Sequence, residues 1–83
     1  MTSKEGWIVC RAYEGMFRDE CAVEVDAGSH VMTIFVGREM VQGRGEQARL
    51  KVQLTERNGE KWALLPTSTR ESIPVRDGQL SGA

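Results

Sequence analysis

A serine and a histidine stand side by side in this chain, and they are the first residues to test for catalytic chemistry. A serine nucleophile needs a neighbouring base, and His30, the only histidine, directly follows Ser29. Both belong to the expected turn Gly28-Ser29-His30, where adjacent side chains point in different directions. The pattern therefore favours an ordinary turn histidine, and we expect no enzyme activity.

Acidic residues and cysteines are the next candidates, because both can bind metal ions. Glu24 and Asp26 fall on one parity of a strand-like segment, but Ca²⁺ binds about six to eight oxygen atoms and two carboxylates are too few. Cys10 and Cys21 form no CxxC pair, and the chain lacks the second histidine that such a zinc site would use. We therefore expect no metal ion and no cofactor.

The two cysteines leave a choice between a disulfide and two free thiols. Cys10 and Cys21 both lie in strand-like segments, so a disulfide is geometrically possible if those strands are neighbours. The first residues show no basic region followed by an apolar stretch, so we expect no signal peptide and a cytoplasmic location. Reduced cysteines are therefore favoured. The longest apolar run, residues 31–36, is strand-sized, so we expect no membrane span.

Composition bounds the class of protein. The chain has 83 residues, 40% hydrophobic and 28% charged, which predicts one small folded domain over residues 5–80 with frayed termini at 1–4 and 81–83. The net charge of −1 provides no basic field for nucleic acid. Arginine outnumbers lysine eight to three, but the arginines are spread along the chain.

The elements that would position any site are organised around residues 47–66. Apolar residues occupy alternate positions from Ala48 to Leu54, the period of a strand with one buried face. Helix-favouring residues and i,i+4 pairs support a helix instead, but a helix would spread the leucines and Val52 around more than half of its surface. We favour a strand, followed by a turn at Asn58-Gly59.

The length of that turn decides which face Trp62 occupies. A two-residue loop pairs Arg57 with Glu60 and places Trp62 on the polar face, beside Arg49 and Lys51. A three-residue loop pairs residue 56 with residue 60 and buries Trp62 and Leu64. Burial of a large apolar side chain contributes about 1.5–3 kcal/mol, so the three-residue loop is favoured.

Further strand-like segments predict an all-β fold. They are residues 6–13, 20–27, 31–36 and 72–75, and in the first of them Ile8, Cys10 and Ala12 form the cleaner inward set. The nearly all-apolar segment 31–36 should be a central strand, whereas Pro74 places the last strand at an edge. We predict five to six short strands in a small barrel or strongly bent antiparallel sheet, SH3-like in size.

Residues 6–25 carry one resemblance to a known family. They read as a strand, the segment Gly15-Met16-Phe17-Arg18, and a second strand. This resembles the KOW segment of SH3-like transcription and ribosomal proteins, where Gly-Pro-Phe-Lys joins two strands. Met16 replaces the proline, and Asp19 or Glu20 replaces a later glycine. The resemblance spans about a quarter of the chain and implies a small barrel with nucleic-acid association.

Two functions from different classes follow. The first is a non-enzymatic protein-interaction or adaptor module, and self-association into a homo-oligomer is one version of it. It would bind its partner through Trp7, Met16, Phe17 and Leu65. The second is a nucleic-acid-binding barrel that combines basic residues with an aromatic such as Tyr13, Phe17 or Trp62. Its basic residues would be Arg11, Arg18, Arg44, Arg49 and Lys51. The first is favoured, because the chain is slightly acidic.

Overall fold

A computed structural model describes residues 3–15, 17–67 and 71–81. Strands dominate this part of the chain, with two short 3-10 turns, η1 (Arg38–Met40) and η2 (Asp77–Gln79), and no α-helix. The strands are β1 (Ser3–Glu14), β2 (Glu20–Ala27), β3 (His30–Gly37), β4 (Val41–Gln42), β5 (Gly45–Arg57), β6 (Glu60–Leu64), β7 (Ser72–Val75) and β8 (Leu80–Ser81). Ser3, Lys4 and Ser81, expected to be frayed, therefore lie in strands.

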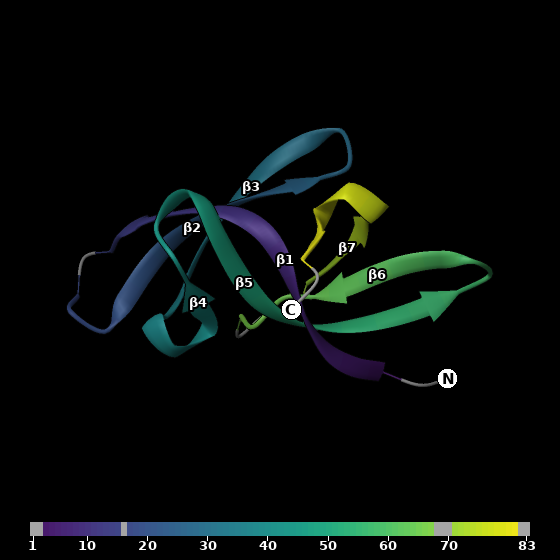
Figure 1. The fold of residues 1–83 in the computed structure, drawn as a ribbon, viewed down its shortest axis with the longest axis horizontal. Coiled ribbons are helices and arrows are strands. Elements are labelled where there is room, and N and C mark those ends of the chain that lie inside the picture. The colour runs from purple at the N-terminus through teal and green to yellow at the C-terminus, as the bar shows by residue number, and fades with distance from the viewer. Residues whose placement is uncertain (1–2, 16, 68–70, 82–83) are drawn as a thin grey trace.

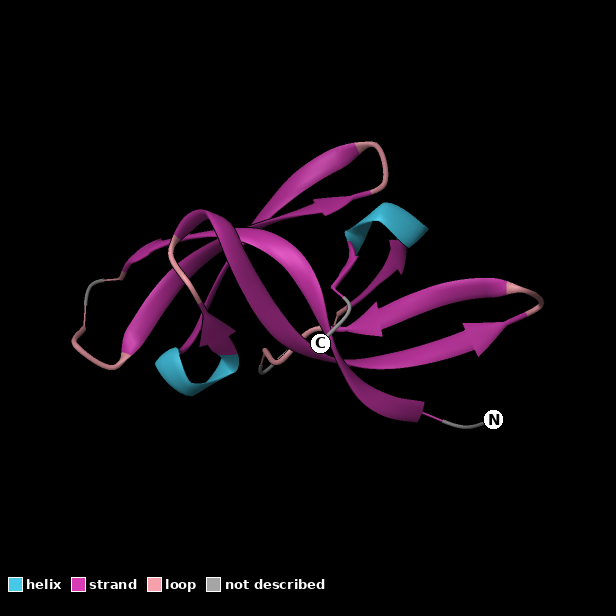
Figure 2. Cartoon of the chain, viewed as in Figure 1, coloured by secondary structure: helices cyan, strands magenta, loops and turns pink. Residues whose placement is uncertain are grey.

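The strands form one strongly curled antiparallel sheet, a half-barrel (Figure 1). Their order is β3-β2-β1-β5-β6-β7, while β4 pairs with β5 and β8 pairs with β1. The two longest strands, β1 and β5, lie together at the centre and cross the whole molecule (Figure 2). The all-β prediction is confirmed. The expected five to six strands correspond to the six on this path, and the two-residue strands β4 and β8 are additional.

The core lies on the concave side of the sheet and is wholly apolar among the described residues. Alternation places every second side chain of a strand inside, as the buried positions of β2 show. On β1 the inward set is the predicted one. The core consists of Ile8, Cys10, Ala12, Cys21, Val23, Val25, Ala27, Ile34, Val36, Ala48, Leu50, Val52, Ala63, Leu65, Ile73 and Val75.

Both cysteines are buried and free, as predicted. The register of β1 on β2 explains why they do not pair. Cys21 lies opposite Glu14, four positions along β1 from Cys10, whose partner on β5 is Ala48. The two strands are neighbours, but the thiols occupy different rungs of the ladder, which a disulfide cannot bridge.

The hairpin of β5 and β6 has the two-residue loop, so the prediction of a three-residue loop was wrong. Arg57 pairs with Glu60, and Glu56 pairs with Lys61. Asn58 and Gly59 both have positive φ, 51° and 80°, as in a type I′ turn whose twist matches that of the strands. This register places two opposite-charge pairs at the hairpin end, whereas the other would place Glu56 against Glu60.

Trp62 consequently lies on the convex side of the sheet and not in the core. It stands between Thr55 on β5 and Pro74 on β7 and is half-buried there. The inward position beside it belongs to Ala63, which is fully buried. The prediction assumed that Trp62 gains burial only in the core. On the outer face, side chains of the neighbouring strands can also cover part of a tryptophan ring, so the difference in burial between the two registers is smaller.

The Asn58-Gly59 turn gives a direct test of this register. Gly59→Ala should lower the free energy of unfolding by about 1–2 kcal/mol, because a Cβ disfavours the left-handed backbone. No neighbouring atom would contact that Cβ, so the cost would come from the backbone alone. Gly78→Ala is the matched control, since Gly78 has no positive φ and equally open surroundings. Urea unfolding of both variants measures the difference, and equal stabilities would contradict a type I′ turn.

The apolar segment 31–36 is not central, contrary to the prediction. β3 forms the expected hairpin with β2 but ends the sheet. Its inner positions, Ile34 and Val36, are buried, whereas Val31 and Phe35 remain exposed on the outer face. Apolar side chains on both faces therefore do not show that both faces are covered within the chain. The expected edge position of the strand with Pro74 is confirmed.

Candidate functional site

The outer face of β1, β2 and β3 carries an exposed aromatic row, Tyr13, Ala22 and Phe35. The register places Tyr13 opposite Ala22 and Ala22 opposite Phe35, so the three side chains share one face on adjacent strands. Tyr13 is 48% exposed and Phe35 58%. With strands about 4.7–4.9 Å apart, the two rings flank the small alanine at a spacing of about 10 Å. This leaves a shallow apolar strip open to solvent.

Phe17 lies just beyond the aromatic row, in the loop that joins β1 to β2. Its side chain is 65% exposed, while its backbone C=O accepts a hydrogen bond from Glu20 N–H at 3.2 Å. Gly15 N–H donates to the Glu20 carbonyl at 3.2 Å, and Arg38 N–H donates to the Asp19 carbonyl at 2.9 Å. The loop backbone is thus tied both to itself and to η1, and it presents an aromatic side chain to solvent.

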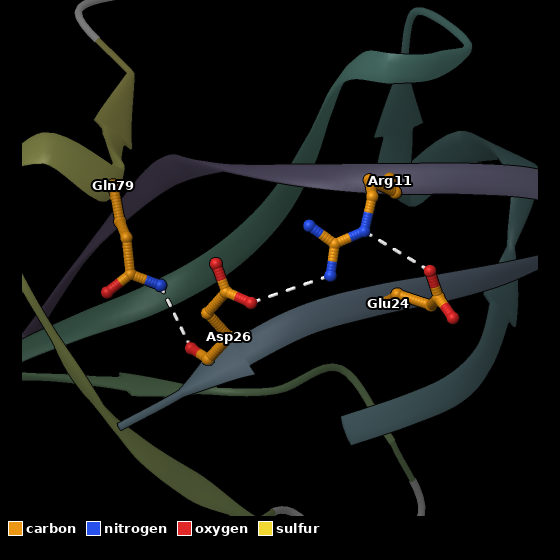
Figure 3. Close-up of polar contacts among 4 residues, drawn as sticks. All are labelled: Arg11, Glu24, Asp26 and Gln79. Atoms are coloured by element: carbon orange, nitrogen blue, oxygen red, sulfur yellow. Dashed lines mark hydrogen bonds and ion pairs between the residues drawn. The ribbon is translucent and has the colours of Figure 1, made fainter. Parts of the chain in front are cut away.

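A polar row borders the aromatic row on the same face. Arg11 on β1 lies opposite Glu24 on β2, and its guanidinium also reaches Asp26 (Figure 3). Arg11 Nε is 3.2 Å from Glu24 Oε1, and Nη2 is 3.5 Å from Asp26 Oδ1. The hydrogen bond to Glu24, with a contribution from Asp26, raises the pKa of Arg11 above its ordinary value. Two carboxylates therefore offset this one positive charge.

Gln79 connects the same row to the C-terminal segment. Its Nε2 donates to the backbone carbonyl of Asp26 at 2.9 Å (Figure 3), and its Oε1 accepts from Arg76 N–H at 2.9 Å. η2 is thereby held against the end of β2, although it follows β7 in sequence. This contact links the segment after β7 to β2.

Of the five basic residues proposed for nucleic acid, three share the outer face of β1 and β5, and two lie elsewhere. Arg49 is exposed on the outer face opposite Val9, while Lys51, opposite Trp7, has its Nζ 3.4 Å from Glu5 Oε1. Arg11 lies in the ion pairs described above. Carboxylates therefore offset the charges of Arg11 and Lys51. Trp62 pairs with Thr55, four or more positions along β5 from Arg49 and Lys51.

Arg18 and Arg44 lie instead near one mouth of the half-barrel. Arg44 lines an open cleft of about 340 Å³ together with Tyr13, Glu14 and Arg38. Arg18 is exposed, and its backbone carbonyl accepts a hydrogen bond from Arg38 Nε. Guanidinium groups beside an aromatic ring can bind an anion, but Glu14 in the same cleft opposes this.

The residues proposed for a protein partner divide into three cases. Phe17 is available, and Trp7 is half-buried on the outer face opposite Lys51. Leu65 is only 1% exposed and belongs to the core, so it is not available to a partner. The two-residue loop at Asn58-Gly59 is the reason, because it turns Leu65 inward. Met16 lies outside the described residues.

Sequence reasoning missed the exposed apolar residues of the aromatic row as a partner surface. Tyr13 was considered only for nucleic acid, and Phe35 and Val31 were expected in a covered strand. The signal that could have found them is the outward parity of segments 6–13 and 31–36, which is apolar at several positions.

No group of three or more His, Cys, Asp or Glu side chains suited to a metal ion occurs among the described residues. Within the same part of the chain, no helix has the length and apolar character needed to cross a membrane. Comparison with known proteins finds no matching family model, no matching curated protein and no matching solved structure. The KOW resemblance thus gains no support from these comparisons.

Proposed function

We propose that this protein is a non-enzymatic protein-interaction module that binds its partner with the outer face of β1, β2 and β3. The observation that carries the proposal is the aromatic row, in which Tyr13 and Phe35 remain exposed on either side of Ala22. Protein interfaces are enriched in aromatic residues at their centre and in polar residues at their rim. The aromatic row and the adjoining Arg11–Glu24 pair have this arrangement.

The alternative, a nucleic-acid-binding barrel, has less support. Arg11 and Lys51 lie beside carboxylates, which reduce their attraction for phosphate. Arg44 lines a cleft with Tyr13, but Glu14 lines the same cleft. Arg18 is exposed, but Asp19 follows it directly in the chain. A cytoplasmic location is part of the proposal and remains a prediction.

The proposal predicts that partner binding depends on Tyr13. In cells that express the tagged full chain, Tyr13→Ser should reduce recovery of cross-linked partner proteins about tenfold or more, the effect of losing an aromatic at the centre of an interface. Val9→Ser is the matched control, because Val9 is an exposed apolar residue of the same strand and face, four positions away. Recovery is measured by quantitative mass spectrometry, and circular dichroism checks that both variants fold.

Salt and nuclease distinguish the two functions in the same experiment. Apolar binding should persist as salt increases, whereas binding through phosphates should weaken steeply. Recovery that disappears after nuclease treatment would favour the nucleic-acid alternative. Equal recovery with wild type and with the Tyr13→Ser variant would remove the aromatic row as the binding surface.

A further inference from the structure

β3 is an unprotected edge of the sheet. The opposite edge strand, β7, contains Pro74, which lacks a backbone donor and limits pairing with another strand. β3 contains no proline, no charged residue and no bulge, because its register on β2 runs without interruption from Ala27↔His30 to Glu20↔Gly37. Long, regular and apolar edges of this kind pair readily with another strand.

The β2–β3 turn determines which backbone groups are free at this edge. Gly28, with φ of 77°, and Ser29 form a two-residue loop closed by the pair Ala27↔His30. The closing pair of such a hairpin exchanges both backbone hydrogen bonds, and bonded pairs then alternate along the ladder. The residues that bond to β2 are therefore His30, Met32, Ile34 and Val36. The residues that alternate with them point their N–H and C=O groups away from β2.

Val31, Thr33 and Phe35 are the residues with outward backbone groups. No backbone hydrogen bond from another described segment reaches them. Their side chains also lie on the exposed outer face, where Val31 is 52% exposed and Phe35 58%. Within the described part of the chain, these three positions therefore combine free backbone donors and acceptors with exposed side chains, of which Val31 and Phe35 are apolar.

These positions are complementary to a second copy of the same strand. We propose that β3 pairs antiparallel with β3 of another molecule about a two-fold axis at Thr33. Val31 then lies opposite Phe35 of the other copy, Thr33 opposite Thr33, and Met32 opposite Ile34. Aromatic–β-branched and threonine–threonine pairs are favourable across strands, and no like charges meet. All three outward residues form bonded pairs, about six hydrogen bonds in total.

Other registers satisfy fewer of these groups. A shift of one residue would place inward side chains opposite outward ones, which antiparallel pairing does not permit. With the axis at Met32, Phe35 of each copy lies opposite the turn of the other. With the axis at Ile34, Val31 of each copy lies opposite the last residue of the other β3. The Thr33 axis also makes one continuous outer face from the aromatic rows of both copies. The inference rests on the proposed function, since it identifies one partner of the same surface as a second copy.

The test removes one outward donor without disturbing β2. Thr33→Pro eliminates an N–H that points away from the sheet, while Thr33→Val keeps it. Analytical ultracentrifugation of the full chain up to millimolar concentration should show a wild-type dimer. Thr33→Pro should raise the dissociation constant about 10- to 100-fold, and Thr33→Val should leave it within about threefold. Circular dichroism verifies the fold.

Disulfide trapping tests the register and does not depend on the proline variant. With the axis at residue 33, Thr33→Cys places two thiols in a bonded pair with Cα atoms about 5.5 Å apart, within the range for a disulfide. Diamide, as the oxidant, should convert this variant to a covalent dimer, each thiol losing its proton and one electron. In the same register, Val31 lies opposite Phe35 of the other molecule, so the two thiols of a Val31→Cys dimer would be four positions apart along the strands. The Val31→Cys variant should therefore stay monomeric on a denaturing gel.

Three outcomes would overturn the inference: a strictly monomeric wild type at millimolar concentration, a dimer insensitive to Thr33→Pro, or trapping by Val31→Cys in place of Thr33→Cys. Each is distinguishable from failure of the proposed function. Tyr13 lies two strands from this edge, so Tyr13→Ser should leave the dimer intact. A monomer that still captures partners through Tyr13 would retain the proposed function and reject the β3 pairing.

Discussion

Leu65→Ala should lower the free energy of unfolding by about 2–5 kcal/mol, whereas Leu64→Ala should lower it by less than about 1 kcal/mol. Leu65 is almost fully buried among the core residues, so truncation would leave a cavity. Leu64 lies on the outer face between Gln53 and Ser72 and is only half-buried. Small domains have a total stability of about 5–15 kcal/mol, so the Leu65 variant would lose a large fraction of it.

The adjacent leucines serve as each other's control. They are the same residue type at adjacent positions at the end of β6, and they point to opposite faces. Urea denaturation followed by tryptophan fluorescence measures both variants. A three-residue loop at residues 57–59 would exchange the two faces, so the larger loss for Leu64→Ala would show that the two-residue register is wrong.

Stability should fall between pH 9 and 11 because of Cys10. Burial raises the pKa of the Cys10 thiol from 9.0 to about 11, an effect that the nearby Arg11 partly offsets. A group whose folded pKa is raised contributes its full stability below the unfolded pKa and loses it as pH rises toward the folded value. If the thiol has a pKa of 9.0 in the unfolded chain and about 11 in the folded protein, the free energy of unfolding should fall by about 2–3 kcal/mol by pH 11.

The contribution of Cys10 is isolated by comparing variants under reducing conditions. Urea unfolding across pH 8–11 should show a smaller decline for Cys10→Ala than for the wild type, although Cys10→Ala is less stable at pH 8. Contributions from the rest of the chain are common to both proteins and cancel in the difference. Val52→Ala truncates another core side chain without removing a thiol, so it is the control and should decline as the wild type does. Parallel pH curves for the wild type and Cys10→Ala would contradict the burial of a protonated thiol.

Local periodicity predicted most of the strands but not their places in the sheet. In β2 and in residues 48–54, apolar residues alternate with polar ones because every second side chain faces inward. The buried positions in the structure match this alternation. The position of β3 depends on long-range pairing, because an apolar strand reads the same whether or not another strand covers it. Its exposed outer face became visible only once β1 and β5 proved to be central.

The candidate site was predictable only in part. Phe17 is a candidate because it is an aromatic residue in a connecting loop. Such a residue more often folds back over the core edge, but the structure leaves Phe17 exposed. The aromatic row depends on the register of three strands, since Tyr13 and Phe35 are 22 residues apart and meet across Ala22. No single-strand pattern contains that information, so the sequence does not identify Phe35 as exposed. The incorrect choice of Leu65 has a different cause, the hairpin register at Asn58-Gly59.

The sequence by itself determined an all-β domain with a small apolar core. It favoured, without deciding, inward-facing Ile8, Cys10 and Ala12 and two free cysteines, and the structure has both. These properties follow from side-chain chemistry and a period of two along each strand. Only the tertiary structure decided the hairpin register, the exposure of the aromatic row and the free edge of β3. Those depend on which strands pair, and a shift of one residue in pairing exchanges the faces of a whole strand.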